Sequence, residues 1–268
     1  MRRATSIPLS PGIFPWRRSN NSHGSLSQKS RELPKWGIFA VIPPPIQQLL
    51  LTALYAAFAE WAEKFAFACR KGCATCCTRS VTMTSLEGGG IMAFLTAMDR
   101  LAELTAPAFQ PTPNRMAQCT TNTFVGAHLK GKSVEEEENW DLRPCPFLKE
   151  ETCSIYPVRP FGCRLFVSLA PCDTCGVAEM PPGYLAGATA LLQCIEHLDN
   201  GGAWGIMTEV LSGLNTGRTD GFGEPTAPIP GFLIAPDEHA LVEPLLQGLL
   251  TLEIAGQPFK QWLEDARL

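Results

Sequence analysis

The sequence has no apolar run long enough to cross a bilayer. Its longest nearly apolar stretch, residues 49–59, holds 11 residues and includes Thr52, whereas a membrane-spanning helix needs about 20. No hydrophobic segment of the kind found in export signals follows the early basic pairs, Arg2-Arg3 and Arg17-Arg18. We therefore expect no transmembrane helix, no membrane partner and a cytoplasmic protein.

Several familiar catalytic signatures are also missing. The chain has no P-loop, no G-x-G-x-x-G after a strand, no G-x-S-x-G elbow and no H-E-x-x-H. Histidine is scarce, with four residues at positions 23, 128, 197 and 239. None of these lies beside a cysteine motif, so we expect His128 and His197 to have surface or core roles. A Rossmann-type cofactor site has no support.

Positive charge is scarce in the main part of the chain. Residues 1–35 carry seven basic and one acidic side chain, whereas residues 36–268 carry 15 basic and 25 acidic ones. Residues 36–268, with their excess of acidic side chains, should not attract nucleic acid. Residues 1–43 are rich in Ser, Asn, Pro and Arg and are predicted to be a disordered basic tail, or a result of start-site choice. The Glu135–Glu138 run is predicted to be a solvated surface.

Hydrophobic periodicity predicts a mainly α fold with long irregular metal-stapled loops and at most a few short strands. The predicted helices span residues 46–69, 85–103, 114–130, 183–198, 203–214, 238–252 and 258–266, and residues 81–84 favour a strand. Residues 141–166 are rich in Pro, Cys and Arg with little periodicity, which predicts a segment held by metal rather than by apolar burial. We expect a metal-chelating domain over 44–175 and a helical extension over 176–268.

The chain has 11 cysteines. In a reducing compartment such residues bind metal or react rather than form disulfides. A C-x3-C-x2-C-C cluster around Gly72 and a second, more widely spaced group can each present thiolates to a soft or borderline cation. The candidate metal ligands are Cys69, Cys73, Cys76, Cys77, Cys145, Cys153 and Cys163. Zinc and iron, including a 4Fe–4S cluster, both suit an all-cysteine site.

The other cysteines carry weaker indications. Cys119 and Cys194 fall in predicted helices and are expected to be small buried hydrophobes. Cys172 and Cys175 form a C-x2-C pair, which can be half a zinc site or a redox pair. Adjacent Cys76 and Cys77 point in different directions and can serve separate metals.

Basic residues surround the cysteine motifs. Arg159 and Arg164 bracket Cys163 and are candidates for lowering thiol pKa and balancing thiolate charge. For Arg143 and Lys149, ordinary pairing with Asp141, Glu150 and Glu151 is equally consistent with the sequence.

The order of these motifs resembles that of a known family. C-x3-C-x2-C-C followed by CPFL, C-x-IY and RPxxCR is similar to the YkgJ-type cysteine-cluster family, described as zinc- or iron-chelating, over residues 68–166. Flagellin lysine methylases, which transfer a methyl group from S-adenosylmethionine, are more distantly similar. The resemblance implies that the seven candidate cysteines are the family's cysteines, and residues 176–268 lie outside it.

Two functions follow as hypotheses. The first is a metal-binding protein in which an all-cysteine zinc, iron or iron–sulfur centre joins the two cysteine motifs. The alternative is an iron–sulfur or zinc enzyme of redox or methyl-transfer type, with an unknown substrate and no assigned catalytic residue.

Overall fold

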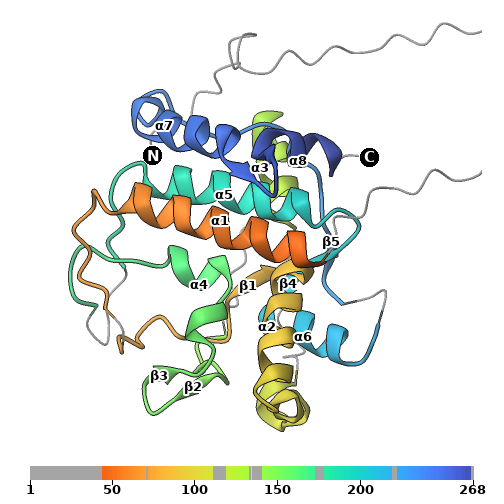
Figure 1. Cartoon of the computed structure of the whole chain (residues 1–268). Coiled ribbons are helices and arrows are strands. Elements are labelled where there is room, and N and C mark those ends of the chain that lie inside the picture. Colours follow the sequence, from red (N-terminus) through yellow and green to blue (C-terminus); the bar gives the residue numbers. More distant parts are fainter. Residues whose placement is uncertain are drawn as a thin grey trace, which may run out of the picture.

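The computed structural model describes residues 44–70, 72–110, 119–132, 134, 141–172, 178–218 and 222–266. Within these ranges the protein is mainly helical with a few short antiparallel strands, which confirms the predicted helix content and the few strands (Figure 1). The predicted tail, the Glu135–Glu138 run and Cys175 lie outside the described residues. In the described part of the chain, no helix combines the length and apolarity needed to cross a membrane.

The first hydrophobic core forms around a pair of long helices. Helix α1 (Pro44–Ala62) packs beside α5 (Tyr184–Leu198), and both contact α7 (His239–Thr251). Helix α8 (Phe259–Asp265) contacts α5 and α7, and α3 (Thr121–Leu129) packs on α5 (Figure 1). Leu54, Phe58, Leu191 and Leu245 belong to this core. A short hairpin of β6 (Glu253–Ile254) and β7 (Gln257–Pro258) joins α7 to α8.

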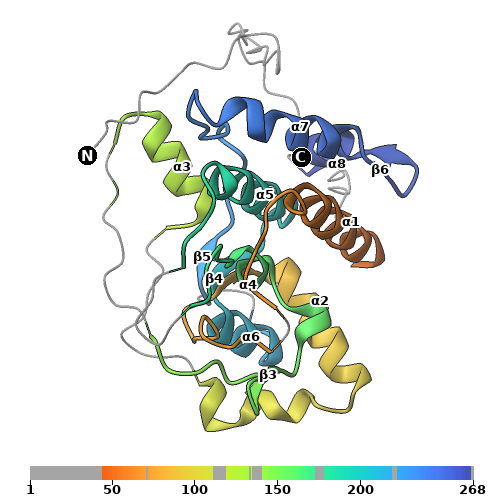
Figure 2. The same cartoon turned by 90° about the vertical axis from the view of Figure 1, so that its left-hand side faces the viewer.

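The second core lies below the first in Figure 2 and joins α2 (Ser85–Ala97) to α6 (Met207–Asn215). A three-stranded antiparallel sheet accompanies these helices, in the order β1 (Thr82–Thr84), β4 (Ala203–Ile206) and β5 (Glu224–Pro225). Met83 of β1 lies opposite Gly205 of β4. Two 3-10 helices, Leu101–Thr105 and Pro107–Phe109, follow α2.

Four predicted helices differ from the structure. The first ends at Ala62 rather than at residue 69, and the second ends at Ala97 before a 3-10 turn. The predicted helix over 203–214 begins as strand β4, because the backbone of residues 203–206 pairs with both β1 and β5. Helix α3 covers 121–129 of the predicted 114–130, whose first residues lie outside the described ranges.

Residues 141–166 form more structure than predicted. They contain β2 (Leu148–Lys149), β3 (Thr152–Cys153), a 3-10 turn (Tyr156–Val158) and α4 (Phe161–Leu165). Phe147 and Ile155 are buried in the second core, and Phe161 is buried in the first. The expectation that this segment lacks apolar docking is therefore wrong. Large side chains spaced without helical or strand periodicity anchor it to both cores.

Candidate metal centre

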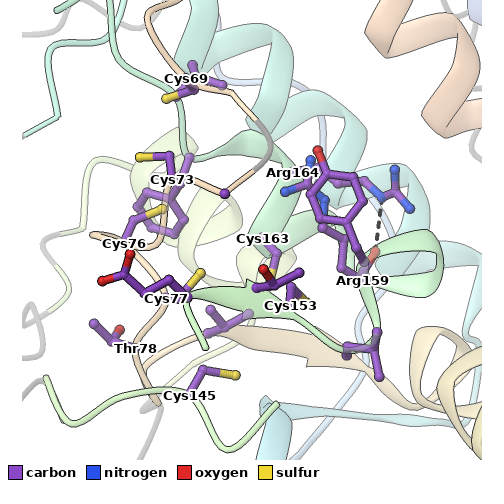
Figure 3. Close-up of a pocket in the computed structure, with 18 of the residues that line it drawn as sticks. Cys69, Cys73, Cys76, Cys77, Thr78, Cys145, Cys153, Arg159, Cys163 and Arg164 are labelled. Carbon is purple, nitrogen blue, oxygen red and sulfur yellow. Dashed lines mark hydrogen bonds between the residues drawn. The ribbon is translucent and has the colours of Figure 1, made fainter. Parts of the chain in front are cut away.

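All seven predicted ligands line one pocket (Figure 3). They are Cys69, Cys73, Cys76, Cys77, Cys145, Cys153 and Cys163. The pocket has a volume of about 220 Å³, well above the roughly 10–15 Å³ that one water needs. The two cysteine motifs, separated in sequence by 67 residues, thus meet at one place.

Two tight turns shape the first motif. The backbone N–H of Cys73 donates to the carbonyl of Arg70 at 3.0 Å, and that of Cys77 donates to Ala74 at 2.9 Å. Gly72 adopts a φ of +93°, a conformation that other residues rarely adopt. These turns bring four cysteines of a nine-residue segment to the pocket wall.

Backbone pairing joins the second motif to the first. The N–H of Cys145 donates to the carbonyl of Cys77 at 2.9 Å, and that of Arg79 donates to Arg143 at 3.0 Å. Thr78 and Pro144 form an isolated antiparallel bridge between these bonds. Cys77 and Cys145 therefore have a fixed spacing even without metal.

Cys153 and Cys163 reach the pocket from separate elements. Cys153 lies on β3 opposite Leu148, and Cys163 lies on α4, which packs on β1. Gly162 permits that packing, because a Cβ at this position would lie 2.6 Å from the carbonyl oxygen of Thr82. Glycine in the RPFGCR motif thus lets α4 carry Cys163 close to the sheet.

Cys69 has its own link to a later segment. The N–H of Ala68 donates to the carbonyl of Ser168 at 2.8 Å, and the N–H of Ser168 donates to the Sγ of Cys69 at 3.2 Å. The chain then continues to half-buried Cys172. This pairing brings the region after α4 to the start of the first motif.

The donor set fits a metal, although the thiols stand apart. Among the described residues, no group of three or more His, Cys, Asp or Glu side chains is close enough to hold a metal ion. Seven cysteines and one carboxylate, Glu151, nevertheless face the same pocket. Thiolate-rich sets favour zinc and iron–sulfur centres over hard cations. A bound metal would draw these thiols closer together than they stand here.

The cysteines differ in acidity. A hydrogen bond from the Cys77 thiol, aided by the charge of Arg159, lowers the pKa of Cys76 to about 6. The same pairing and burial raise the pKa of Cys77. Burial raises the pKa of Cys145 to about 11 and also raises the pKa of Cys163. Without metal at neutral pH, Cys76 is therefore a thiolate while these three are thiols.

Two arginines form another part of the pocket wall. The guanidinium of Arg159 lies 4.2 Å from the ring centre of Tyr156, and its buried Nε has no hydrogen-bond partner within the described residues. Arg164 donates to the carbonyls of Arg159 and Pro157, each at 2.9 Å. Both arginines were predicted near Cys163, and the structure places both at the pocket.

Other basic residues near the motifs pair with acids. Arg143 forms an ion pair with Asp141 at 2.6 Å, as the surface-pairing alternative expected. Lys149 contacts Glu103 at 2.9 Å rather than neighbouring Glu150 or Glu151. None of the four paired residues lines the pocket.

The histidines and isolated cysteines lie elsewhere. The Nε2 of buried His197 lies 2.7 Å from the carbonyl oxygen of Leu263, and the Nδ1 of His128 lies 3.1 Å from that of Phe124. Both histidines therefore have structural contacts. Cys194 is buried in α5 as predicted. Cys119 is half-buried and precedes α3 rather than lying within a helix.

Sequence reasoning missed the second role of Glu87. Its position three residues after Thr84 indicates a capping box, which the structure contains. Its carboxylate also accepts from the N–H of Phe161 at the start of α4, the helix that carries Cys163. No local pattern signals that contact, which joins residues 74 positions apart.

A pocket lined by thiols offers the ligands that soft or borderline metal ions prefer. Residues 68–176 match the model of the CxxCxxCC family, described as a putative zinc- or iron-chelating domain. This match confirms the resemblance seen in the motifs and extends it past Cys172. No curated protein and no solved structure gives a significant match to the chain.

Proposed function

We propose that the protein binds zinc or iron through an all-cysteine centre that joins the 69–77 loop to residues 145–163. One observation carries this proposal: seven cysteines from two distant motifs line a single pocket. Chance burial of small side chains would not gather them around one space while Cys194 packs in the apolar core. The family match at residues 68–176 supports the same chemistry.

Metal binding would supply the positive charge that the buried thiols need in order to lose their protons. Removing the protons of these thiols is unfavourable without a cation. The hydrogen bond to Cys76 and then burial raise the pKa of Cys77, and burial raises the pKa of Cys145 and Cys163. A metal ion offsets that cost, and structural zinc sites bind with apparent free energies of roughly 10–16 kcal/mol at pH 7. Metal uptake should therefore release protons. The positive charge of Arg159 would partly balance a thiolate-rich centre.

Anaerobic purification with elemental analysis tests the proposal. We expect stoichiometric zinc or iron in the purified chain. A brown sample whose broad absorbance bleaches on reduction would identify iron–sulfur, whereas a colourless sample would identify zinc. A fully folded protein without either metal would overturn the proposal.

Serine variants compare the pocket with the core. Replacement of Cys73, Cys76, Cys145 or Cys163 should lower metal content, because the remaining ligands no longer close the site. Cys119→Ser and Cys194→Ser are the controls and should retain metal. Equal metal content in both groups would show that the pocket cysteines are not ligands.

A catalytic role is the second candidate, and the pocket wall supports it. Beyond the thiols, the pocket is lined by Tyr156 and by Arg159, whose Nε lacks a partner in the described part of the chain. Such a surface suits a small anionic or aromatic molecule held beside the metal. Equilibrium binding of S-adenosylmethionine to the metal-loaded protein tests the methyl-transfer version, and absence of binding would reject it.

A further inference from the structure

We propose that the cysteines form two separate four-thiolate centres, one of Cys77, Cys145, Cys153 and Cys163 and the other of Cys69, Cys73, Cys76 and Cys172. This inference rests on the proposed metal binding and adds its stoichiometry and an eighth ligand. A tetrahedral zinc site or a 4Fe–4S cluster uses four thiolates. The seven pocket cysteines are too many for one such centre and too few for two.

The first centre is built on the paired backbones of the two motifs. The hydrogen bond between Cys145 N–H and Cys77 O fixes two of its members. Cys153 joins them through the β2–β3 hairpin, where Ser154 N–H donates to Phe147 O at 2.8 Å and Leu148 N–H donates to Cys145 O at 2.9 Å. The Cys163 thiol lies within electrostatic range of both Cys145 and Cys153.

The second centre is built on a different pairing. Ser168 contacts both Ala68 and the sulfur of Cys69, which brings the segment leading to Cys172 beside the first motif. The Cys69 thiol lies within electrostatic range of Cys73, Cys76 and Cys172. A backbone N–H donated to a ligand sulfur, as Ser168 provides, is a common feature that tunes iron–sulfur centres.

The boundary between the two centres falls between consecutive residues. Figure 3 shows Cys69 and Cys73 at one end of the pocket and Cys145 at the other, with Cys76 and Cys77 between them. Cys76, but not Cys77, is among the strongest electrostatic neighbours of Cys69, whereas Cys77 lies within range of Cys145 and Cys163 as well as of Cys76. In the metal-free protein the Cys77 thiol donates to the Cys76 sulfur, so the division requires this contact to break when each sulfur binds its own metal.

Metal stoichiometry tests the division. The anaerobically purified full chain should hold two zinc ions, or two clusters with roughly eight irons in all. Cys172→Ser and Cys153→Ser should each lose half of the metal, and the double variant should lose all of it. Cys175→Ser is the matched control, because it lies in the same C-x2-C pair and should retain both centres.

Each outcome has a distinct meaning. One zinc or four irons per chain would overturn the two-centre division while leaving the proposed function standing. Absence of metal from the folded protein would overturn both. Loss of metal from Cys175→Ser but not from Cys172→Ser would overturn the assignment of the eighth ligand.

A measurement on the wild-type chain avoids dependence on variant folding. Graded chelation followed by alkylation and mass spectrometry should expose the cysteines in two sets of four, with Cys172 becoming reactive together with Cys69, Cys73 and Cys76. Simultaneous exposure of all eight would contradict the division. Reactivity of Cys172 in the fully loaded protein would also contradict it.

Discussion

The carboxylate of Glu87 accepts a hydrogen bond of 2.6 Å from the backbone N–H of Phe161. The same carboxylate accepts from Thr84 N–H at 3.0 Å and from the Tyr55 hydroxyl at 2.7 Å. One buried side chain therefore caps α2 and also holds the start of α4, two residues before Cys163. The position of one proposed ligand thus depends on a residue outside the cysteine motifs.

Glu87→Gln should destabilise the protein by on the order of 2 kcal/mol, since hydrogen bonds to charged groups contribute about 1.5–3 kcal/mol each. An amide has one acceptor oxygen, so it leaves at least one buried N–H facing another N–H. Urea unfolding of the metal-loaded chain measures the change, and metal content should fall with it. Glu60→Gln on the exposed face of α1 is the control. If Glu87→Gln lowers the free energy of unfolding no more than Glu60→Gln does, the capping role is contradicted.

Gly162→Ala should displace α4 from β1. The new Cβ would lie 2.6 Å from the carbonyl oxygen of Thr82, a backbone atom that cannot rotate away. We expect destabilisation of about 1–3 kcal/mol and weaker metal retention. Gly89→Ala is the matched control, because its Cβ meets nothing within 4 Å and alanine favours a helix by about 0.8–1 kcal/mol. In thermal unfolding, Gly162→Ala should lower the melting temperature and Gly89→Ala should raise it. A higher melting temperature for Gly162→Ala would refute the close packing.

Cys76 should be the most reactive thiol of the metal-free protein. Its pKa of about 6 keeps it a thiolate at neutral pH, and the thiolate is the nucleophile. Its alkylation by iodoacetamide should rise with pH around 6 and then level off, while buried Cys163 and Cys194 react slowly. Cys77→Ala removes the donor and should move this midpoint upward. Alkylation of Cys76 that rises only near pH 8.5 would contradict the Cys76–Cys77 pairing.

Glu103 should give a small pH-dependent contribution to the free energy of unfolding. Hydrogen bonds from Arg100, followed by Lys149, lower its pKa to about 2. A lowered acid pKa stabilises the fold above the unfolded value near 4.3, and this contribution is lost as pH falls toward 2. Solvent screening limits it to about 0.2–1 kcal/mol. Urea unfolding of metal-free Glu103→Gln and wild type should differ at pH 7 and converge near pH 2. A difference that persists at pH 2 would contradict the ion pair.

Local signals in the sequence predicted much of the fold. The apolar spacing of α1 and the apolar run of α5 depend on neighbouring residues, so both helices can be predicted directly. Strand β4 could not be predicted from local signals, because residues 203–206 become a strand only through pairing with β1 and β5. The burial of Phe147 and Ile155 was missed for a similar reason, since single side chains dock onto a core that distant helices build.

For the candidate site, too, local signals were predictable and distant contacts were not. Cysteine spacing predicted which residues would gather, and the pocket contains all seven. Cysteine spacing could not show that Ser168 contacts Cys69 or that Glu87 holds α4, because each contact joins segments more than 70 residues apart. Those distant contacts position the candidate cysteines, whereas the motifs name the candidates.

X-ray absorption at the metal edge of the anaerobically purified chain tests the central claim most directly, because it reports the atoms bound to the metal. The account predicts a shell made entirely of sulfur, at about 2.3 Å if the metal is zinc. A shell dominated by nitrogen or oxygen at about 2.0–2.2 Å would contradict an all-cysteine centre.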